Sequence, residues 1–272
     1  MIDVISIQSQ VVYGHVGNSA AVFPMQAKGL EVAAVPTALL SNHPRYPTVH
    51  GQMLDPELIA GLLQGIEERG VLDTARIIVT GYLSSADNTA VVAAFVERAQ
   101  QRHPQLVYVC DPVMGDDDLG VFVKPALRDA FRERLVPMAT IVTPNQFELE
   151  LLTGRKARTL AGLDEAMTAL GGGAISAAVT GCVLDDTAPG SVETITWSPQ
   201  GTGRTTRPRL PIRPCGTGDL FTGLMTSRLW AGESLAEAGA GATEEIFAIL
   251  QRTQAVGAGE TCIVGFPFAA TS

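Results

Sequence analysis

A chain of 272 residues that is 46% hydrophobic and 17% charged can build a large core, and this composition excludes a mainly disordered protein. The net charge is −9 and only three lysines occur, so nucleic acid is not an expected partner, because phosphate binding needs clustered Lys and Arg. No apolar run reaches about 18 residues, the four cysteines are too scattered for a zinc or disulfide framework, and the N-terminus lacks a basic signal-peptide start. We expect a cytoplasmic protein without a membrane partner, folded as one domain over residues 1–272.

Short apolar runs alternate with helical patterns along the first two thirds of the chain. Buried strands are predicted at Ile2–Ile7, Val32–Thr37, Arg76–Gly81, Leu106–Cys110, Thr140–Thr143 and Ala174–Thr180. One helical stripe runs over residues 58–66, after Asp55 as N-cap and Pro56, and another runs over 91–99 after Asp87. Strands alternating with helices predict an α/β fold, with a mostly parallel sheet covered on both faces.

The last third is patterned less clearly. Residues 187–213 are rich in Thr, Pro, Gly and Arg, and they predict an edge strand at Val192–Trp197 together with an irregular connection. Residues 217–231 have apolar side chains at helical spacing, which predicts a helix that packs inward. Beyond Gln254 the only expected element is a strand at Thr261–Val264.

Common nucleotide and hydrolase signatures are missing from the chain. No G-x-x-x-x-G-K-[ST] phosphate loop occurs, and no strand is followed by G-x-G-x-x-G. Neither H-E-x-x-H nor G-x-S-x-G occurs, so no motif supports a zinc peptidase or a Ser-His-Asp hydrolase. Any chemistry on a phosphate therefore has to use another device.

Ligands of parallel α/β sheets bind beyond the carboxyl ends of the strands, and four stretches of this chain fall there. The first, Ser9–Ala21, exceeds the roughly 2–6 residues usual for such loops, which favours function. Its alternative interpretation is a long connection in which Asn18 caps the next helix. The second, Ser41–Pro47, carries His43 and Arg45 between prolines; by itself it favours a structural or exposed histidine.

The third stretch, Cys110–Gly120, is acidic. Asp111 follows a predicted strand, and Pro112 prevents the strand from continuing, so we expect this carboxylate to face the ligand cleft. Asp116–Asp118 form either a solvated turn or part of a cation site. Several carboxylates near one cleft suit Mg²⁺, which binds one or two carboxylates together with phosphate oxygens and water.

The fourth stretch, Thr143–Gly154, joins a strand to a helix. Thr143 ends the strand and Asn145 opens the helix, with Glu148 three residues later. One interpretation is a capping box in which Asn145 and Glu148 satisfy each other's backbone groups. The other places Glu148 over the same cleft as Asp111.

The sequence Gly216-Thr217-Gly218-Asp219 opens the predicted helix of residues 217–231. Backbone N–H groups at such a helix start, together with the helix dipole, favour an anion. Asp219 would repel a bound phosphate, unless the anion develops during a reaction in which Asp219 takes a proton from the attacking hydroxyl. Phosphoryl transfer needs this combination of a positioned base and N–H donors.

In this order, the stretches resemble the pyridoxal kinases of the ribokinase-like superfamily. The matching pieces are IQSQVVYGHVGNSAAVFP (7–24), SNH (41–43), GYLSS (81–85), CDPVMGD (110–116), TPNQFELELLTG (143–154) and GTGDLFTG (216–223). The resemblance implies a ribokinase-like fold, with a central, mostly parallel sheet and helices on both faces, and a homodimer. It also implies ATP- and Mg²⁺-dependent phosphorylation of pyridoxal, with pyridoxine and pyridoxamine as further substrates and K⁺ as a further cation.

The resemblance assigns roles to individual residues. On the substrate side, Ser9 would hold the pyridine ring and His43 would lie beside it. The further substrate contacts would be Pro44, Arg45 and Tyr82. The contacts to ATP would be Asp111, Thr143, Glu148 and Thr180, and those to Mg²⁺ would be Asp111, Asp116 and Glu148. The catalytic set would be Gly216, Thr217 and Gly218 as anion hole, with Asp219 deprotonating the 5′-hydroxymethyl group.

Other functions stay open at this point. Hydroxymethylpyrimidine kinases resemble this chain but typically carry Cys where Asp219 stands, and a ribokinase-type sugar kinase is a further alternative. Family members commonly show Lys near Thr180 and Thr in place of Pro44. These two departures keep open a non-catalytic protein that binds pyridoxal or its phosphate, although binding alone needs no base at Asp219.

Overall fold

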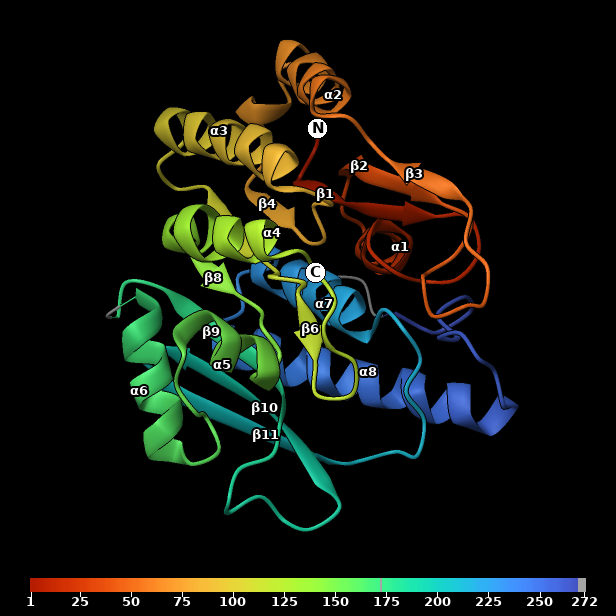
Figure 1. The fold of residues 1–272 in the computed structure, drawn as a ribbon, viewed down its shortest axis with the longest axis vertical. Coiled ribbons are helices and arrows are strands. Elements are labelled where there is room, and N and C mark those ends of the chain that lie inside the picture. Colours follow the sequence, from red (N-terminus) through yellow and green to blue (C-terminus); the bar gives the residue numbers. More distant parts are fainter. Residues whose placement is uncertain (172, 269–272) are drawn as a thin grey trace.

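A nine-stranded sheet runs through the computed structural model, which describes residues 1–171 and 173–268 (Figure 1). The strands are β1 (Val4–Val11), β2 (Val32–Leu40), β3 (Gly51–Met53), β4 (Ile77–Thr80), β5 (Val107–Cys110), β6 (Gly115–Asp116), β7 (Gly120–Val121), β8 (Ile141–Val142), β9 (Ser176–Cys182), β10 (Ser191–Ser198) and β11 (Gly201–Pro208). Their spatial order is β11-β10-β9-β8-β5-β4-β1-β2-β3, and β6 pairs only with β7.

Helices connect most of these strands. The α-helices are α1 (Asn18–Ala27), α2 (Pro56–Glu68), α3 (Ala86–Arg102), α4 (Pro125–Ala130), α5 (Gln146–Thr153), α6 (Leu160–Gly171), α7 (Thr217–Trp230) and α8 (Leu235–Val256). Short 3₁₀ turns lie at Val71–Asp73 and Val136–Met138, and a π-helical turn lies at Phe131–Leu135. Within the described residues, no helix combines the length and the apolar character that crossing a bilayer requires.

The central strands are parallel and buried on both faces. All pairs from β2 through β1, β4, β5 and β8 to β9 are parallel, whereas β3, β10 and β11 add antiparallel pairs at the two edges. Alternate residues of a strand point to opposite faces. In β1, Ile5 and Ile7 enter one apolar cluster while Val4 enters the other. Continuous apolar runs in the sequence therefore correspond to strands covered on both sides.

Two groups of helices cover the sheet. Helices α2 to α6 pack on one face, around Phe95 and Phe131, and helices α1, α7 and α8 pack on the other, around Met25 and Leu224 (Figure 1). The expected mostly parallel sheet between two helical layers is confirmed. Since α1 follows β1 and α5 follows β8, these helices begin at the carboxyl edge of the sheet, where ligands of such folds bind.

The first strand is longer than predicted. It continues to Val11, because Gln10 and Val11 pair with Leu39 and Leu40 of β2 beyond a register shift at Ser9. Ser9 therefore lies inside β1, opposite a β-bulge of β2, and not at the end of the strand. The extra residue of this bulge lies on β2, where Pro36 and Leu39 are three positions apart while their partners Gln8 and Gln10 are two apart. Bulges are common next to active sites.

Several further predictions of local structure are wrong. The expected irregular connection is a hairpin, in which β10 is internal and β11 forms the edge of the sheet. Residues 261–264 form no strand, and the long helix α8 was not anticipated. Helix α3 begins at Ala86, five residues before the predicted stripe, and is capped by Ser85, whose hydroxyl accepts from the backbone of Asn88. Gly17 is the N-cap of α1, while the Asn18 side chain is buried against β1 and β2.

Candidate active site

Carboxylates gather where the carboxyl ends of β5 and β8 meet the first turns of α5 and α7. Asp111 follows β5, and its Oδ2 accepts a hydrogen bond of 3.0 Å from the hydroxyl of Thr222 on α7. The same hydroxyl lies 3.0 Å from Oγ1 of Thr143, directly after β8. Glu148 on α5 and Asp219 on α7 are near enough for their charges to act on Asp111. Asp111, Thr143, Glu148 and Asp219 thus share one site, as their positions in the sequence predicted.

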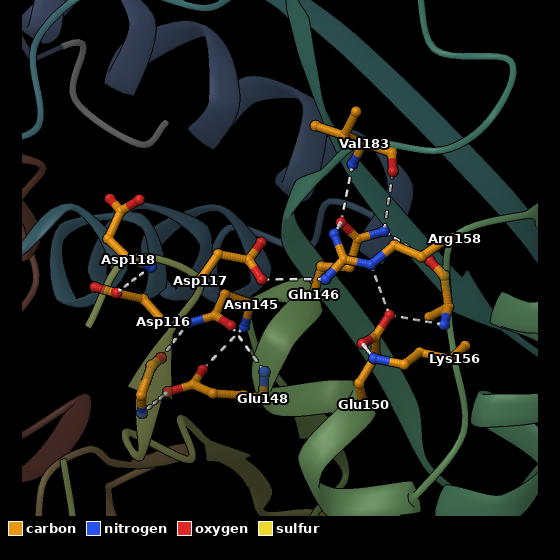
Figure 2. A network of polar contacts seen from close by, with 12 residues as sticks. Asp116, Asp117, Asp118, Asn145, Gln146, Glu148, Glu150, Lys156, Arg158 and Val183 are labelled. Atoms are coloured by element: carbon orange, nitrogen blue, oxygen red, sulfur yellow. Dashed lines mark hydrogen bonds and ion pairs between the residues drawn. The ribbon is translucent and has the colours of Figure 1, made fainter. Parts of the chain in front are cut away.

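Glu148 joins helix α5 to the loop after β5. It forms the predicted capping box, since Asn145 Oδ1 accepts from Glu148 N at 2.8 Å and Glu148 Oε2 accepts from Asn145 N at 2.9 Å (Figure 2). Its other oxygen, Oε1, accepts from the backbone N–H groups of Met114 at 2.8 Å and Gly115 at 3.3 Å. The capping-box interpretation is confirmed, and the same carboxylate lies within electrostatic reach of Asp111 and Asp219.

Burial raises the pKa of all three carboxyl groups. The pKa of Asp219 rises to about 6, although a backbone N–H from Gly17 favours its charged form. The pKa of Glu148 rises to about 7 through burial, which outweighs its three backbone N–H donors. The pKa of Asp111 is well above its usual range, because of burial first and then repulsion by Glu148 and Asp219. A bound cation favours the ionised forms of these carboxyl groups, which burial and mutual repulsion disfavour.

The donor set fits Mg²⁺. Among the described residues, no hydrogen bond reaches Oδ1 of Asp111, so this oxygen can ligate a metal directly. Both oxygens of Glu148 accept N–H groups, which suits Glu148 to a metal-bound water. In residues 1–171 and 173–268, no three His, Cys, Asp or Glu side chains are arranged to hold a metal by themselves. The residues therefore fit an ion that takes its other ligands from phosphates and water.

The acidic stretch after Gly115 is an ordered hairpin. Asp116 Oδ1 accepts from two backbone N–H groups of the β6–β7 turn, one of them that of Asp118 at 2.9 Å (Figure 2). Asp117 pairs with Arg158 at 3.1 Å, and Asp118 pairs with Arg213. These contacts account for the three acids structurally, and a metal contact of Asp116 stays a prediction.

The glycine turn lies at the start of α7. Gly216 is the N-cap and has a φ of 80°, and a Cβ at this position would collide with the carbonyl oxygen of His15. Thr217 and Gly218 are the first two residues of the helix, so their N–H groups have no partner within it. Asp219 is the next residue and lies in the same first turn. Donors for an anion and a carboxylate with a raised pKa thus occur in four consecutive residues.

The chain after β1 packs against this turn. Ser9 is buried opposite the bulge, and a Cβ at Gly17, whose φ is 54°, would collide with the carbonyl oxygen of Ser9. The N–H of Gly17 in turn donates to Asp219. The long loop singled out in the sequence therefore lies between Ser9 of β1 and the predicted base.

The remaining predicted substrate residues lie after β2 and β4. His43 is buried, whereas Pro44 and Arg45 are exposed. Arg45 Nη1 lies 3.8 Å from the thiol of Cys215, the residue before the glycine turn. Tyr82 is half-buried, which raises the pKa of its hydroxyl. The structure thus brings Arg45 to the glycine turn, and the contacts of all four residues with a substrate stay predictions.

Thr180 lies beside the end of β8. Its backbone N–H donates to the carbonyl of Pro144 at 3.0 Å, and it forms an isolated parallel bridge with Asn145. This places Thr180 on β9 beside Pro144 and Asn145, the residues that follow Thr143. A contact of Thr180 with a nucleotide stays a prediction.

Glu260 is a residue of this region that the sequence did not reveal. Its carboxylate accepts from Tyr46 Oη at 2.7 Å, contacts His43 Nε2 at 3.0 Å and accepts from His15 N at 3.1 Å. The tail after Gln254 has little pattern, so no signal in the sequence marks Glu260. Only the fold brings this tail to the loops after β1 and β2.

Comparisons with known proteins agree with this geometry. A family model described as phosphomethylpyrimidine kinase matches residues 17–263. A pyridoxine/pyridoxal/pyridoxamine kinase of Bordetella avium is 43% identical over 88% of this chain and 81% of its own. The pyridoxal kinase PdxY of Deinococcus radiodurans is 41% identical over 96% and 90%. The structure of a pyridoxal kinase from Leishmania donovani with ADP and ginkgotoxin has a TM-score of 0.88 at 30% identity and covers 98% and 94% of the two chains.

Proposed function

The chain belongs to the pyridoxal kinase family, as its motifs predicted, and from this premise we propose that it transfers the γ-phosphoryl group of ATP to the 5′-hydroxymethyl group of pyridoxal. The product would be pyridoxal 5′-phosphate, formed by salvage of vitamin B6. One observation carries the proposal: a half-buried carboxylate, Asp219, follows directly on the glycine turn that exposes N–H donors.

Asp219 has the properties of a general base. A base works best when its pKa lies near the working pH, and burial raises the pKa of Asp219 to about 6. At pH 7 the group is then mostly ionised, yet basic enough to take the proton of a positioned hydroxyl. The hydroxyl oxygen attacks the γ-phosphorus as the bond to the ADP oxygen breaks, and the proton passes to Asp219.

The N–H groups at the start of α7 stabilise the charge that develops on the transferred group. Thr217 and Gly218 supply these donors, and Gly216 allows the turn that exposes them. Preorganised donors of this kind act on the transition state more than on the ground state. In this proposal Asp219 takes the proton, and the glycine turn stabilises the developing charge.

Asp111 and Glu148 are the residues that would hold Mg²⁺, the first directly and the second through water. When bound, Mg²⁺ neutralises phosphate charge and orients the transferred group. Thr143 and Thr180 lie beside this pair and would contact the nucleotide phosphates. The structure of the Leishmania relative contains ADP, which supports ATP as the phosphoryl donor. A K⁺ site stays a prediction.

The substrate side is proposed from Ser9 opposite the bulge, His43 and Tyr82, with Pro44 and Arg45 at the rim. The Bordetella relative is named for three forms of vitamin B6, which supports pyridoxine and pyridoxamine as further substrates. The matching family model is described as phosphomethylpyrimidine kinase, so hydroxymethylpyrimidine is the competing substrate.

An ATP-consumption assay with purified protein separates these functions. Pyridoxal, pyridoxine, pyridoxamine, hydroxymethylpyrimidine and ribose are compared at equal concentration, with and without Mg²⁺. We expect the highest kcat/KM for a B6 vitamer. A higher value for hydroxymethylpyrimidine or ribose would replace the proposal, and binding of pyridoxal without ATP turnover would point to a carrier.

A further inference from the structure

Glu260 connects three segments that are distant in the sequence. It follows α8, and its side chain is only 12% exposed. Its Oε1 accepts from the phenol of Tyr46 at 2.7 Å and lies 3.0 Å from His43 Nε2, and its Oε2 accepts from the backbone N–H of His15 at 3.1 Å. Gly14 packs so closely that an added Cβ would lie 2.6 Å from Oε2. The carboxylate therefore fixes the loops after β1 and β2 at once.

These contacts determine the tautomer of His43. A carboxylate has no proton to give at neutral pH, so Nε2 of His43 must be the donor toward Glu260. In the neutral ring, Nδ1 is then an acceptor, and it is buried without a partner among the described residues. The ring is also held by Tyr46, whose centroid lies 4.6 Å away at an interplanar angle of 32°.

We infer that Glu260 is a positioning residue, which holds His43 in the Nε2–H tautomer so that Nδ1 accepts a hydrogen bond from the aromatic ring substituents of the substrate. The inference rests on the proposed function, because it takes the substrate to lie beside His43. A buried acceptor without a partner is unfavourable, so a donor supplied by the ligand is the natural complement. A hydroxyl or a protonated ring nitrogen provides such a donor.

The substitution Glu260→Gln inverts the donor pattern with little change in size. The backbone N–H of His15 can only donate, so the amide oxygen should face it. The amide NH₂ then faces Tyr46 and His43, which can both change from donor to acceptor. His43 should therefore adopt the Nδ1–H tautomer. Its Nδ1–H group would then face the donor group of the substrate, and the hydrogen bond between them would be lost.

Kinetics and NMR test this chain of effects. We expect Glu260→Gln to raise the KM for pyridoxal about tenfold, the range of one hydrogen bond to a charged or buried group, with kcat and the KM for ATP within about twofold. Long-range ¹H–¹⁵N spectra should show the change of tautomer at His43. Glu237→Gln is the control, since Glu237 lies in an exposed capping box of α8. It should change none of these values.

A double-mutant cycle separates positioning from support of the loop. In a His43→Ala background, Glu260→Gln should add no further increase in the KM for pyridoxal. Independent effects in the cycle, or an equal loss of kcat and ATP affinity, would overturn the inference. If Glu260→Gln fails to fold, the same spectra of the wild-type protein still test the inference, because an Nδ1–H tautomer of His43 there would overturn it. The NMR readout requires no turnover, so it tests Glu260 even if the wild-type protein proves inactive on pyridoxal.

Discussion

Replacing Asp219 with asparagine removes the proton acceptor but keeps the size and an accepting oxygen of the side chain. A positioned general base contributes roughly 10²–10⁴-fold to a rate, so kcat for pyridoxal should fall by about that factor. The KM values for ATP and pyridoxal should change little, because the base acts mainly in the transition state. The wild-type kcat should rise with pH through about 6 and then level off, as Asp219 ionises. The variant should lack this dependence, and coupled detection of ADP between pH 5 and 8 measures both.

The same substitution should stabilise the fold. Burial raises the pKa of Asp219 from 3.8 to about 6, so the folded state binds this proton more tightly than the unfolded chain does. Ionised Asp219 therefore costs about 3 kcal/mol at pH 7, a cost that asparagine does not carry. The variant's free energy of unfolding should exceed the wild-type value by up to that amount at pH 7. The difference should shrink as the pH falls through 6, which urea unfolding measures.

Retention of more than a tenth of the wild-type kcat by Asp219→Asn would refute the assignment of Asp219 as the base. Asp87→Asn is the matched control, because Asp87 lies in the first turn of α3 but is exposed. It should leave kcat unchanged and shift the free energy of unfolding by no more than about 0.5 kcal/mol. Equal losses in the two variants would point to a general effect of acidic first turns.

Four further outcomes are expected. Glu148→Gln should raise the Mg²⁺ concentration needed for half-maximal rate and lower kcat while leaving the KM for pyridoxal nearly unchanged, and an unaltered Mg²⁺ titration would leave Glu148 with its capping role alone. Ser9→Ala should raise the KM for pyridoxal but not for ATP, by about 0.5–1.5 kcal/mol in binding; the reverse pattern would move the ring elsewhere. Cys215→Ala should keep most of the activity, because burial raises the pKa of this thiol and makes it a poor nucleophile; inactivation by a thiol reagent that pyridoxal prevents would contradict this. Light scattering should give the mass of a homodimer, and a monomeric mass would refute that prediction.

The parallel core could be predicted because its strands are buried on both faces. Runs such as residues 77–80 and 107–110 are continuous in apolar character, which no alternating surface strand would show. The carboxyl ends of parallel strands share one edge of the sheet. Because Asp111 directly follows β5 and Thr143 directly follows β8, their positions in the sequence were enough to predict that they lie close together. Glu148 could be placed for the same reason, since it lies in the first turn of the helix that follows β8.

Other features depend on contacts that no local pattern records. Strand β11 is polar and mostly exposed, so its composition does not predict a strand. It is extended because its backbone pairs with that of β10. The bulge opposite Ser9 arises from the register between β1 and β2. Glu260 reaches His43 across 217 positions of the chain, at the end of a segment with no periodic signal. Such contacts follow from tertiary packing and had to be seen in the structure.

The cluster of acids is unfavourable for the protein by itself. Asp111 and Glu148 are buried and the half-buried Asp219 lies near them, and within the described residues no Lys, Arg or His forms an ion pair with any of the three. Apolar or paired side chains at these positions would make a more stable fold. Under the proposed function, a bound cation would offset the repulsion between these carboxylates, and the substrate hydroxyl would give its proton to Asp219, the base of raised pKa. The energetic cost therefore lies where phosphoryl transfer requires it, at Asp219 and its two acidic neighbours.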